Sequence, residues 1–268
     1  MISAVVLTKN EEDFIRNCLE SVKWVDEIII VDSGSTDKTL DIAKNYTSKI
    51  IHTKNDDFSQ RRNLGMEKAS GEWVLYIDSD ERVLLPLREE IEALVNRDNG
   101  VSAYAISRRN IIFGKEVNYG LYKKDWVIKL LRKRDFKGFK GKVHEYPKFE
   151  GDLGYTKNSL LHLTHRDIDQ ITIKSLAWSK IDARLRMDAG HPKMTGWRFL
   201  RILITELFNQ GFKRGGFFNG TVGVMDSLVQ VFSLLITYIR LWQMQQKGFD
   251  DIYKDIDRRL KENEFKDI

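Results

Sequence analysis

The sequence predicts an α/β fold in which a mostly parallel central sheet carries helices on both faces, followed by a C-terminal helical extension. Two observations in residues 1–82 predict the sheet: four short apolar runs recur, and helical patterns separate them. Continuously apolar strands are typical of parallel sheets that are covered on both faces. The third observation is the change to long helical patterns from Ile168 onward, which predicts the extension.

The first third of the chain gives each element its own signal. Branched and aromatic apolar residues predict strands at residues 2–7, 27–31, 48–52 and 73–77. A helix is expected at residues 11–22, where one face collects Phe14, Ile15, Cys18, Leu19 and Val22. Two further helices are expected at 39–45, after the turn and N-cap of residues 33–37, and at 58–69, which Gly71 helps to end.

The middle of the chain continues the same sheet. A helix is expected at residues 87–96 and strands at 103–107 and 127–132, so residues 1–165 are predicted to form one domain and 166–268 a helical region. The longest apolar part of that region, residues 228–242, contains Gln230 and Arg240 and falls short of the ~20 residues that a spanning helix needs. Two interpretations stay open: contact with a membrane interface, or a helical subdomain or dimer contact.

Composition limits the function classes. Hydrophobic residues make up 42% of the 268 residues and charged residues 31%, which indicates a globular protein. The single cysteine, Cys18, excludes an internal disulfide framework and a cysteine-based zinc site, and it fits a reducing compartment. No basic and apolar leader precedes the first predicted strand, so no signal peptide is expected and the protein is predicted to be cytoplasmic.

Positive charge is concentrated in residues 104–150, where 13 Lys and Arg stand against 5 Asp and Glu. The rest of the chain has 31 against 34, so the excess is a patch. Two interpretations of this patch stay open. It binds phosphates or an anionic glycolipid, or it is a solvent-exposed loop without a binding role. No nucleic-acid-binding motif accompanies it, and no nucleic-acid partner is expected.

Polar residues follow each strand of the first third, at the edge of the sheet where open parallel sheets bind ligands. They are Thr8, Asn10 and Glu11, then Asp32, Ser33 and Ser35, then Asn55, Asp56 and Asp57, and last Asp78, Ser79 and Asp80. Asp78 and Asp80 end the run EWVLYIDSDE, and carboxylates suit Mg²⁺ or Mn²⁺ that bridges a diphosphate. Neither a Walker A sequence nor a Gly-x-Gly-x-x-Gly is present, so ATP hydrolysis and dinucleotide redox chemistry lack their phosphate cradle.

Three segments carry a family resemblance: VVLTKNEE, IIIVDSGSTDKT and FSQRRNLGMEKASGEWVLYIDSDE resemble family 2 glycosyltransferases of the GT-A fold. The resemblance is nearest to the lipooligosaccharide β-1,4-glucosyltransferase-like subgroup. It implies a metal-dependent, inverting transfer of a hexose from a UDP-sugar, UDP-glucose first, to an envelope glycan or glycolipid of the lipopolysaccharide core type. It also implies a nucleotide-binding half at residues 1–100, an acceptor half at 101–165, and a protein that is soluble or peripheral on the inner face of the cytoplasmic membrane.

The same resemblance assigns roles to residues. Asp80 would ligate Mg²⁺ or Mn²⁺, and Glu145 in the segment GKVHE would be the catalytic base that takes the proton of the acceptor hydroxyl. His162 and His165 alternate on an expected strand, so at most one reaches the metal, and His165 is the predicted ligand. The predicted nucleotide-sugar contacts are Thr8, Asn10, Glu11, Asp32, Ser35, Gln60, Arg61, Asn63 and Asp78.

Two other functions stay open. A sugar-1-phosphate nucleotidyltransferase also pairs carboxylates on an α/β sheet, but its first loop is normally rich in glycine and residues 8–11 contain none. A catalytically inactive GT-A protein acting as a membrane assembly partner is the second, and the intact Asp78, Asp80 and Glu145 argue against it.

Overall fold

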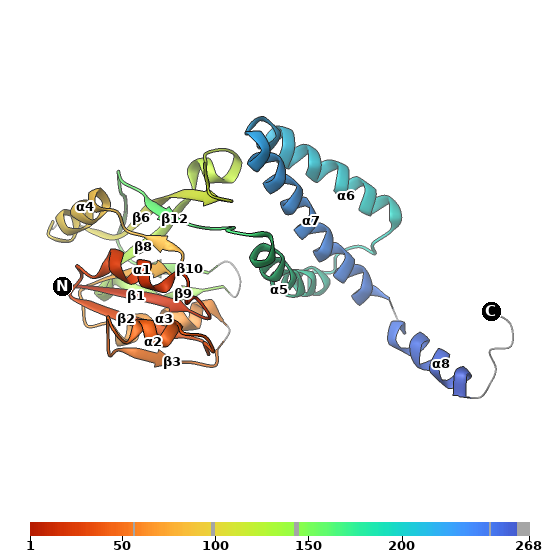
Figure 1. The fold of residues 1–268 in the computed structure, drawn as a ribbon, viewed down its shortest axis with the longest axis horizontal. Helices are drawn as coiled ribbons and strands as arrows, with labels where there is room; N and C mark the ends of the chain where they lie inside the picture. The colour runs from red at the N-terminus through yellow and green to blue at the C-terminus, as the bar shows by residue number, and fades with distance from the viewer. Residues whose placement is uncertain (56, 98–99, 142–144, 247, 262–268) are drawn as a thin grey trace. The chain divides into compact units, whose positions relative to one another are not determined.

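The chain divides into two compact units, Met1–Arg166 and Asp167–Ile268 (Figure 1). This computed structural model describes residues 1–55, 57–97, 100–141, 145–246 and 248–261. Asp56 and the first part of the GKVHE segment, Lys142 to His144, lie outside the described residues.

The first unit is built on a ten-stranded sheet with the order β3-β2-β1-β4-β8-β6-β12-β5, in which β11 and β7 also pair with β6. The four N-terminal strands are parallel, as predicted, whereas β8 runs antiparallel between β4 and β6. The sheet is therefore mixed, and the predicted α/β fold of the GT-A type is confirmed. The strands are β1 (Ile2–Thr8), β2 (Glu27–Asp32), β3 (Ile50–His52), β4 (Trp73–Asp78), β5 (Glu81–Arg82), β6 (Val101–Ile112), β7 (Lys115–Val117), β8 (Trp126–Arg132), β11 (Asp152–Tyr155) and β12 (Leu160–His162).

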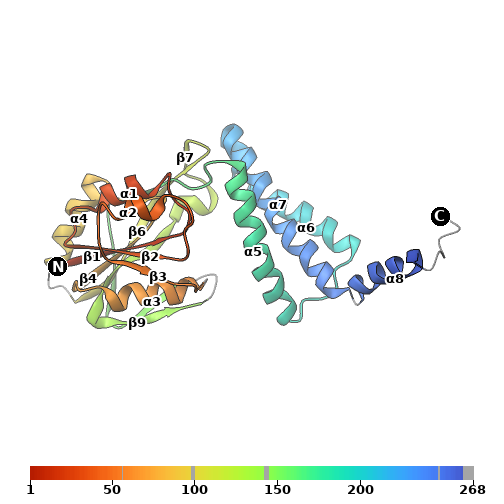
Figure 2. The same ribbon diagram turned by 60° about the horizontal axis from the view of Figure 1, so that its bottom comes forward.

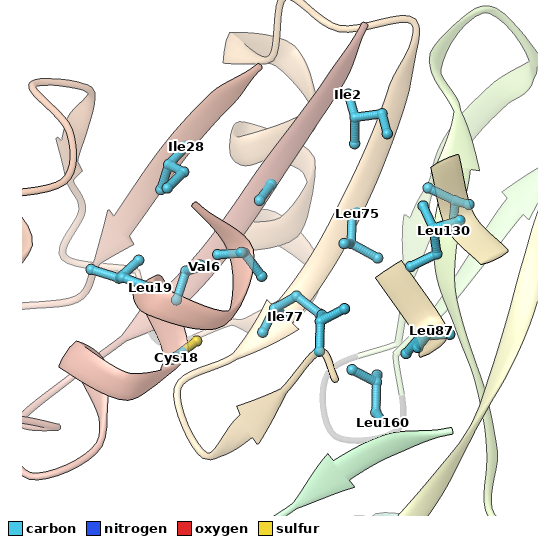
Figure 3. Packing of buried hydrophobic residues seen from close by; sticks show 14 of the residues in the cluster. Ile2, Val6, Cys18, Leu19, Ile28, Leu75, Ile77, Leu87, Leu130 and Leu160 are labelled. Atoms are coloured by element: carbon cyan, nitrogen blue, oxygen red, sulfur yellow. The ribbon is translucent and has the colours of Figure 1, made fainter. Parts of the chain in front are cut away.

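Both faces of the sheet are covered (Figure 2). On one face, α1 (Ile15–Val22), α2 (Thr39–Ala43) and α4 (Leu85–Val95) pack on alternate residues of β1, β2 and β4. Figure 3 shows this core, where Cys18 and Leu19 of α1 lie against Val6 and Ile77. On the other face, α3 (Phe58–Lys68) and the hairpin of β9 (Phe136–Lys140) and β10 (Tyr146–Phe149) cover the remaining set. The alternation of the two sets follows from the period of two along a strand.

A buried carboxylate, Glu27, ties the amino ends of the first strands together. It accepts hydrogen bonds from the Ser3 hydroxyl, from the backbone and hydroxyl of Ser70, and from Lys49. Burial alone would raise its pKa, but Lys49 and the serine donors outweigh this effect and lower the pKa of Glu27 to about 2.

Glu27→Gln is expected to lower the free energy of unfolding at pH 7 by about 2 kcal/mol, since it weakens charge-assisted hydrogen bonds. Because the folded pKa lies below the unfolded value of about 4.3, the contribution is present above that value and fades as the pH falls toward 2. Urea titrations at pH 7 and pH 3 should therefore show a smaller gap at pH 3. A gap of equal size at both pH values, or an equal loss in the exposed control Glu67→Gln, would contradict the assignment.

The second unit is helical: α5 (Ile168–Asp188), α6 (Gly196–Phe208), a π-helical turn (Asn209–Lys213), a 3₁₀ turn (Gly216–Phe218), α7 (Gly220–Gln245) and α8 (Phe249–Lys261). Among the described residues, α7 is the helix that is long and apolar enough to cross a membrane, with a mean hydropathy of 1.7 in its most apolar window. The expectation that the apolar stretch is too short was wrong, because the helix begins eight residues before Leu228. Core helices of soluble proteins meet the same criterion, and Leu241 of α7 packs with Ala183 of α5.

Candidate active site at the carboxyl edge of the sheet

The register of the parallel strands brings the polar clusters to one edge. Thr8 pairs with Asp32, Asp32 with His52, and Leu7 with Asp78. The carboxyl ends of β1, β2, β3 and β4 therefore lie level with one another. This is the edge at which ligands bind in an open α/β sheet.

Hydrogen bonds join the loop after β1 to the loop after β2. Asn10, with a φ of +54°, donates its backbone N–H to the Ser35 hydroxyl at 2.9 Å and accepts from the Thr36 backbone at 2.7 Å. Glu11 donates its backbone N–H to the Thr39 hydroxyl at 2.7 Å. The predicted contacts Asn10, Glu11 and Ser35 thus fix the shape of this rim through the bonds described.

Asp32 and Thr8 lie beneath that rim, and both are almost fully buried. Asp32 accepts hydrogen bonds from the Gly34 backbone at 3.0 Å and from the Ser35 hydroxyl at 2.6 Å. The buried Thr8 hydroxyl has no hydrogen-bond partner among the described residues. A buried polar group without a partner costs free energy, so Thr8 has the chemistry of a group that a ligand satisfies.

Helix α3 contributes three side chains that the sequence singles out, and two of them hold the neighbouring hairpin and loop. Asn63 exchanges two hydrogen bonds with the backbone of Phe139 in β9, at 2.7 and 3.3 Å. The side chain of Gln60 accepts from Asn55. Arg61 is buried, donates to the Ser33 hydroxyl at 2.7 Å and stacks on Phe58 with 4.2 Å between its guanidinium carbon and the ring centroid.

Arg62, the neighbour of the predicted Arg61, joins the two most important carboxylates. Its Nη2 donates to Asp78 at 3.1 Å and its Nε donates to Glu145 at 3.2 Å. Tyr76 holds the helix at this point, because its hydroxyl donates to the Arg62 carbonyl at 2.8 Å. The predicted base and the first carboxylate of the Asp-x-Asp motif therefore share one guanidinium, although 67 positions separate them in sequence.

Lys129 of β8 lies on the other side of Asp78. Its ammonium group donates to Asp78 and to Glu81, each at 2.6 Å, and its side chain is only 1% exposed. Burial alone would raise the pKa of Asp78, but Lys129 and then Arg62 outweigh it and hold the pKa well below its usual range. Asp78 is therefore a carboxylate ionised at all physiological pH values.

Asp80 faces a histidine: its Oδ2 lies 3.6 Å from Nε2 of His162, the last residue of β12. That distance is too long for a hydrogen bond. His165 lies beyond the strand with a φ of +50°, and its carbonyl accepts from the Phe113 backbone at 3.0 Å. Of the two histidines offered by the sequence, His162 is placed next to Asp80 by a described contact, and the role of His165 at the metal stays a prediction.

A chain of bonds behind His162 fixes its tautomer. Asn110 donates its side-chain amide to Asp125 at 3.0 Å, so its oxygen faces Nδ1 of His162 at 2.6 Å. Nδ1 therefore carries a proton, so in the neutral form of the ring the lone pair lies on Nε2, the nitrogen that faces Asp80. Although burial acts to raise the pKa of Asp125, the bidentate Arg108 lowers it, so Asp125 stays ionised and holds the amide in place.

The donor set fits a divalent cation. Two acceptors that face each other 3.6 Å apart can both ligate one ion at about 2.1 Å. No group of three or more His, Cys, Asp or Glu side chains forms a metal site within the part of the chain that the structure describes. A protein contribution of two ligands matches ions that take their remaining ligands from phosphate and water.

The basic segment is less available than its charge indicates. Arg108 is held by Asp125, Arg109 by Glu116 at 2.7 Å, and Arg132 stacks on Trp73. Lys123 stays exposed, as does Trp126, whose ring lies 5.2 Å from that of Tyr155.

Sequence reasoning missed Lys129, Glu81, Asn110 and Asp125. A lysine inside the apolar strand WVIKLLR was the one local signal, since an unpaired ammonium group is not buried. The others depend on strand neighbours far apart in sequence, which no local pattern reveals.

Comparisons with known proteins show the family to which the chain belongs. Residues 3–151 match the model of "Glycosyl transferase family 2". The lipopolysaccharide core biosynthesis glycosyltransferase LpsC of Rhizobium meliloti is 25% identical over 252 residues, which cover 90% of this chain and 92% of LpsC. An uncharacterized glycosyltransferase of Rickettsia typhi, RT0209, is 27% identical over 95% of this chain and 91% of its own length.

Solved structures with similarity include TarS residues 1–349 of S. aureus in complex with UDP, at 17% identity and a TM-score of 0.47, covering 80% of this chain and 72% of that one. The glucosyl-3-phosphoglycerate synthase of Mycobacterium tuberculosis with Mg²⁺ and UDP is 25% identical, with a TM-score of 0.36, over 41% of this chain and 44% of that one. The family model spans more than half of the residues. The chain belongs to glycosyl transferase family 2 and is a glycosyltransferase.

Proposed function

We propose that this enzyme transfers a hexose from a UDP-sugar to an envelope glycan or glycolipid of the lipopolysaccharide core type, with inversion and with a divalent cation. The observation that carries the proposal is Arg62, which holds Glu145 and Asp78 in one site. It places a carboxylate suited to deprotonating an acceptor beside the edge suited to a nucleotide. The similarity to LpsC over nearly the whole chain supports the class of acceptor.

The donor would lie across the carboxyl ends of β1, β2 and β4. Thr8, with its unpartnered hydroxyl, and Asp32 would frame the base and ribose, on a rim shaped by Asn10, Glu11 and Ser35. Gln60 and Asn63 would act by fixing α3, while Arg61 would face the diphosphate. UDP-glucose is our first choice of donor.

Asp80 and His162 would hold Mn²⁺ or Mg²⁺, and the imidazole nitrogen favours Mn²⁺ over Mg²⁺. His165, the ligand predicted from the sequence, stays a second candidate. When bound, the cation neutralises charge on the diphosphate leaving group. Asp78 would act differently, since Arg62 and Lys129 already neutralise it, and would hold Arg62 in place beside the donor phosphates.

Glu145 would act in a single displacement. The acceptor oxygen bonds to the anomeric carbon, its proton passes to Glu145, and the bond to UDP breaks with its electron pair on the diphosphate. Arg62 keeps Glu145 oriented until the proton arrives. On the acceptor side, Lys123 would attract an anionic group, and the exposed Trp126 and Tyr155 rings would stack on sugars. The acceptor would be reached at the inner face of the cytoplasmic membrane.

Release of UDP from a panel of UDP-sugars with Mn²⁺ and a glycolipid acceptor tests the function. Glu145→Gln is expected to lower kcat by about 10²–10⁴-fold while UDP binding in thermal shift stays unchanged. Glu150→Gln, an exposed carboxylate paired only with Lys137 in the described contacts, is the control and should keep its kcat.

Three outcomes contradict the proposal. Formation of UDP-sugar from UTP and a sugar phosphate would indicate a nucleotidyltransferase. Binding of UDP and Mn²⁺ without hydrolysis or transfer of any UDP-sugar would indicate an inactive assembly partner. A Glu145→Gln variant with more than half of the normal kcat would remove the assigned base.

The hydrogen bonds from Asp125 through Asn110 to His162 give a separate prediction. Asn110→Leu removes the oxygen that accepts from Nδ1, so the ring loses its orientation, and the affinity for Mn²⁺ should fall by about 10–100-fold. Titration of Mn²⁺ in the presence of UDP, followed by electron paramagnetic resonance, measures this directly. Asn96→Leu, on an exposed helix end, is the control. An unchanged affinity in Asn110→Leu would show that His162 is not a ligand.

A further inference from the structure

Helix α6 exposes a continuous stripe of large apolar side chains. Trp197, Leu200, Ile204 and Phe208 recur at spacings of three and four residues, which places them on one side of the helix. Their exposed fractions are 70%, 47%, 58% and 58%. Phe212 and Phe218 continue the stripe past the end of the helix, at 52% and 73%. We call these six residues the α6 face.

The opposite side of α6 packs into the core of the helical unit. The α6 face is therefore not the side by which α6 contributes to that core. Phe199 and Ile202 lie against the buried cluster of Met194 and Leu241. Helices of globular proteins normally bury one apolar stripe and expose a polar one. α6 carries two apolar stripes, one buried and one exposed.

The aromatic end of the α6 face is preformed. The Phe212 ring lies 5.7 Å from that of Phe208 and 6.0 Å from that of Phe218. Phe217 fits so closely over Gly211 that a Cβ there would lie 2.3 Å from its ring. A contiguous apolar patch of this kind marks an interaction surface, unlike single exposed apolar residues.

Basic residues accompany the α6 face. Residues 196–219 contain Arg198, Arg201, Lys213 and Arg214 against one acidic residue, Glu206. The Glu206 carboxylate accepts a hydrogen bond from the Gln210 side chain at 2.8 Å. Two copies of this chain joined through the face would bring like charges together, whereas an anionic lipid surface would complement them.

We propose that the α6 face docks on a bilayer that contains anionic lipids, with Trp197 and the phenylalanines at the level of the headgroups. Amphipathic helices with basic residues and with Trp, Phe and Leu on the apolar side bind membranes in this orientation. The statement that docking brings the active site to a lipid-linked acceptor rests on the proposed function. The docking itself rests on the α6 face alone.

Sedimentation of the full chain with vesicles tests the docking. Wild-type protein should bind vesicles of phosphatidylcholine with 30% phosphatidylglycerol at least about tenfold more tightly than phosphatidylcholine alone, and 0.5 M salt should weaken that binding. The triple variant Trp197→Ser, Ile204→Ser, Phe208→Ser should lose at least about tenfold in affinity for the anionic vesicles. The matched control replaces three exposed apolar residues of α5, Ile173, Trp178 and Leu185, with serine and should change affinity less than twofold.

Four outcomes would overturn the docking. The first is equal binding by the triple variant and wild type, and the second is an equal loss in the α5 control. The third is a lipid-free dimer in analytical ultracentrifugation that the triple variant dissociates, which would assign the α6 face to a second copy. The fourth is binding that survives high salt and alkaline extraction, which would indicate insertion of α7 instead.

Thermal shift with UDP and Mn²⁺ separates this proposal from the proposed function. The triple variant should keep the wild-type shift, which also shows that it folds. If no UDP-sugar is used as a donor while vesicle binding still follows the α6 face, the docking stands and the proposed function falls.

Discussion

Asp80→Asn should abolish UDP release that depends on a divalent cation, with kcat reduced by about 10²–10³-fold, a loss typical of removing one group that stabilises transition-state charge. Asp80 and His162 are the two protein ligands that the geometry offers, 3.6 Å apart. An amide cannot supply the negative charge that holds the ion against the diphosphate. UDP release measured in MnCl₂ and again in chelator gives the effect.

The same variant should not lose stability. Asp80 lies near the carboxylates of Asp78 and Glu81, so removal of its negative charge relieves repulsion between them in the metal-free protein. We expect an unchanged or higher Tm in the absence of metal, together with loss of the Mn²⁺-induced rise in Tm. Asp41→Asn, an exposed helix residue paired with Lys44, is the control for both measurements. Full activity of Asp80→Asn in chelator would end the metal assignment.

Lys129→Met should lower the free energy of unfolding by about 3–5 kcal/mol, the largest stability change that we expect. Met matches the length of the lysine chain, so the core loses little packing. The loss arises because Glu81, fully buried, and the carboxylate of Asp78 are left without the ammonium group 2.6 Å away. Urea titration at pH 7 measures the change.

A compensating variant separates charge from packing. Lys129→Met combined with Glu81→Gln removes one of the two stranded charges and should recover a substantial part of the loss. Lys137→Met breaks a largely exposed pair with Glu150 and should cost less than about 1 kcal/mol. A loss below about 1 kcal/mol in Lys129→Met would show that Lys129 does not neutralise this network.

The sequence was informative wherever a single segment decides its own structure. The apolar runs that became β1, β2 and β4, and the rule that ligands bind at their carboxyl ends, sufficed to select Thr8, Asp32 and Asp78. The register later placed these residues level with one another. Element ends were less certain, since β6 extends to Ile112, five residues past its predicted end.

The site was harder to predict wherever the contact is made between distant segments. Arg61 and Arg62 differ by about 100° around α3, and only the position of β4 decides that Arg62 is the one that meets Asp78. The position of the His162 ring next to Asp80 likewise depends on where β12 ends and on Asn110 of the neighbouring strand β6. Such choices require the tertiary structure.

The insertion of β8 between β4 and β6 has a consequence for biosynthesis. During translation, Asp78 and Glu81 emerge about fifty residues ahead of Lys129, their ammonium partner. A nascent chain that stops near residue 100 would have strand β4 exposed along one side and Glu81 without Lys129 and Arg108, so we expect that the nucleotide-binding half does not fold on its own. The sheet can reach its native strand order only after β8 has left the ribosome. A truncation before residue 132 should therefore yield insoluble protein.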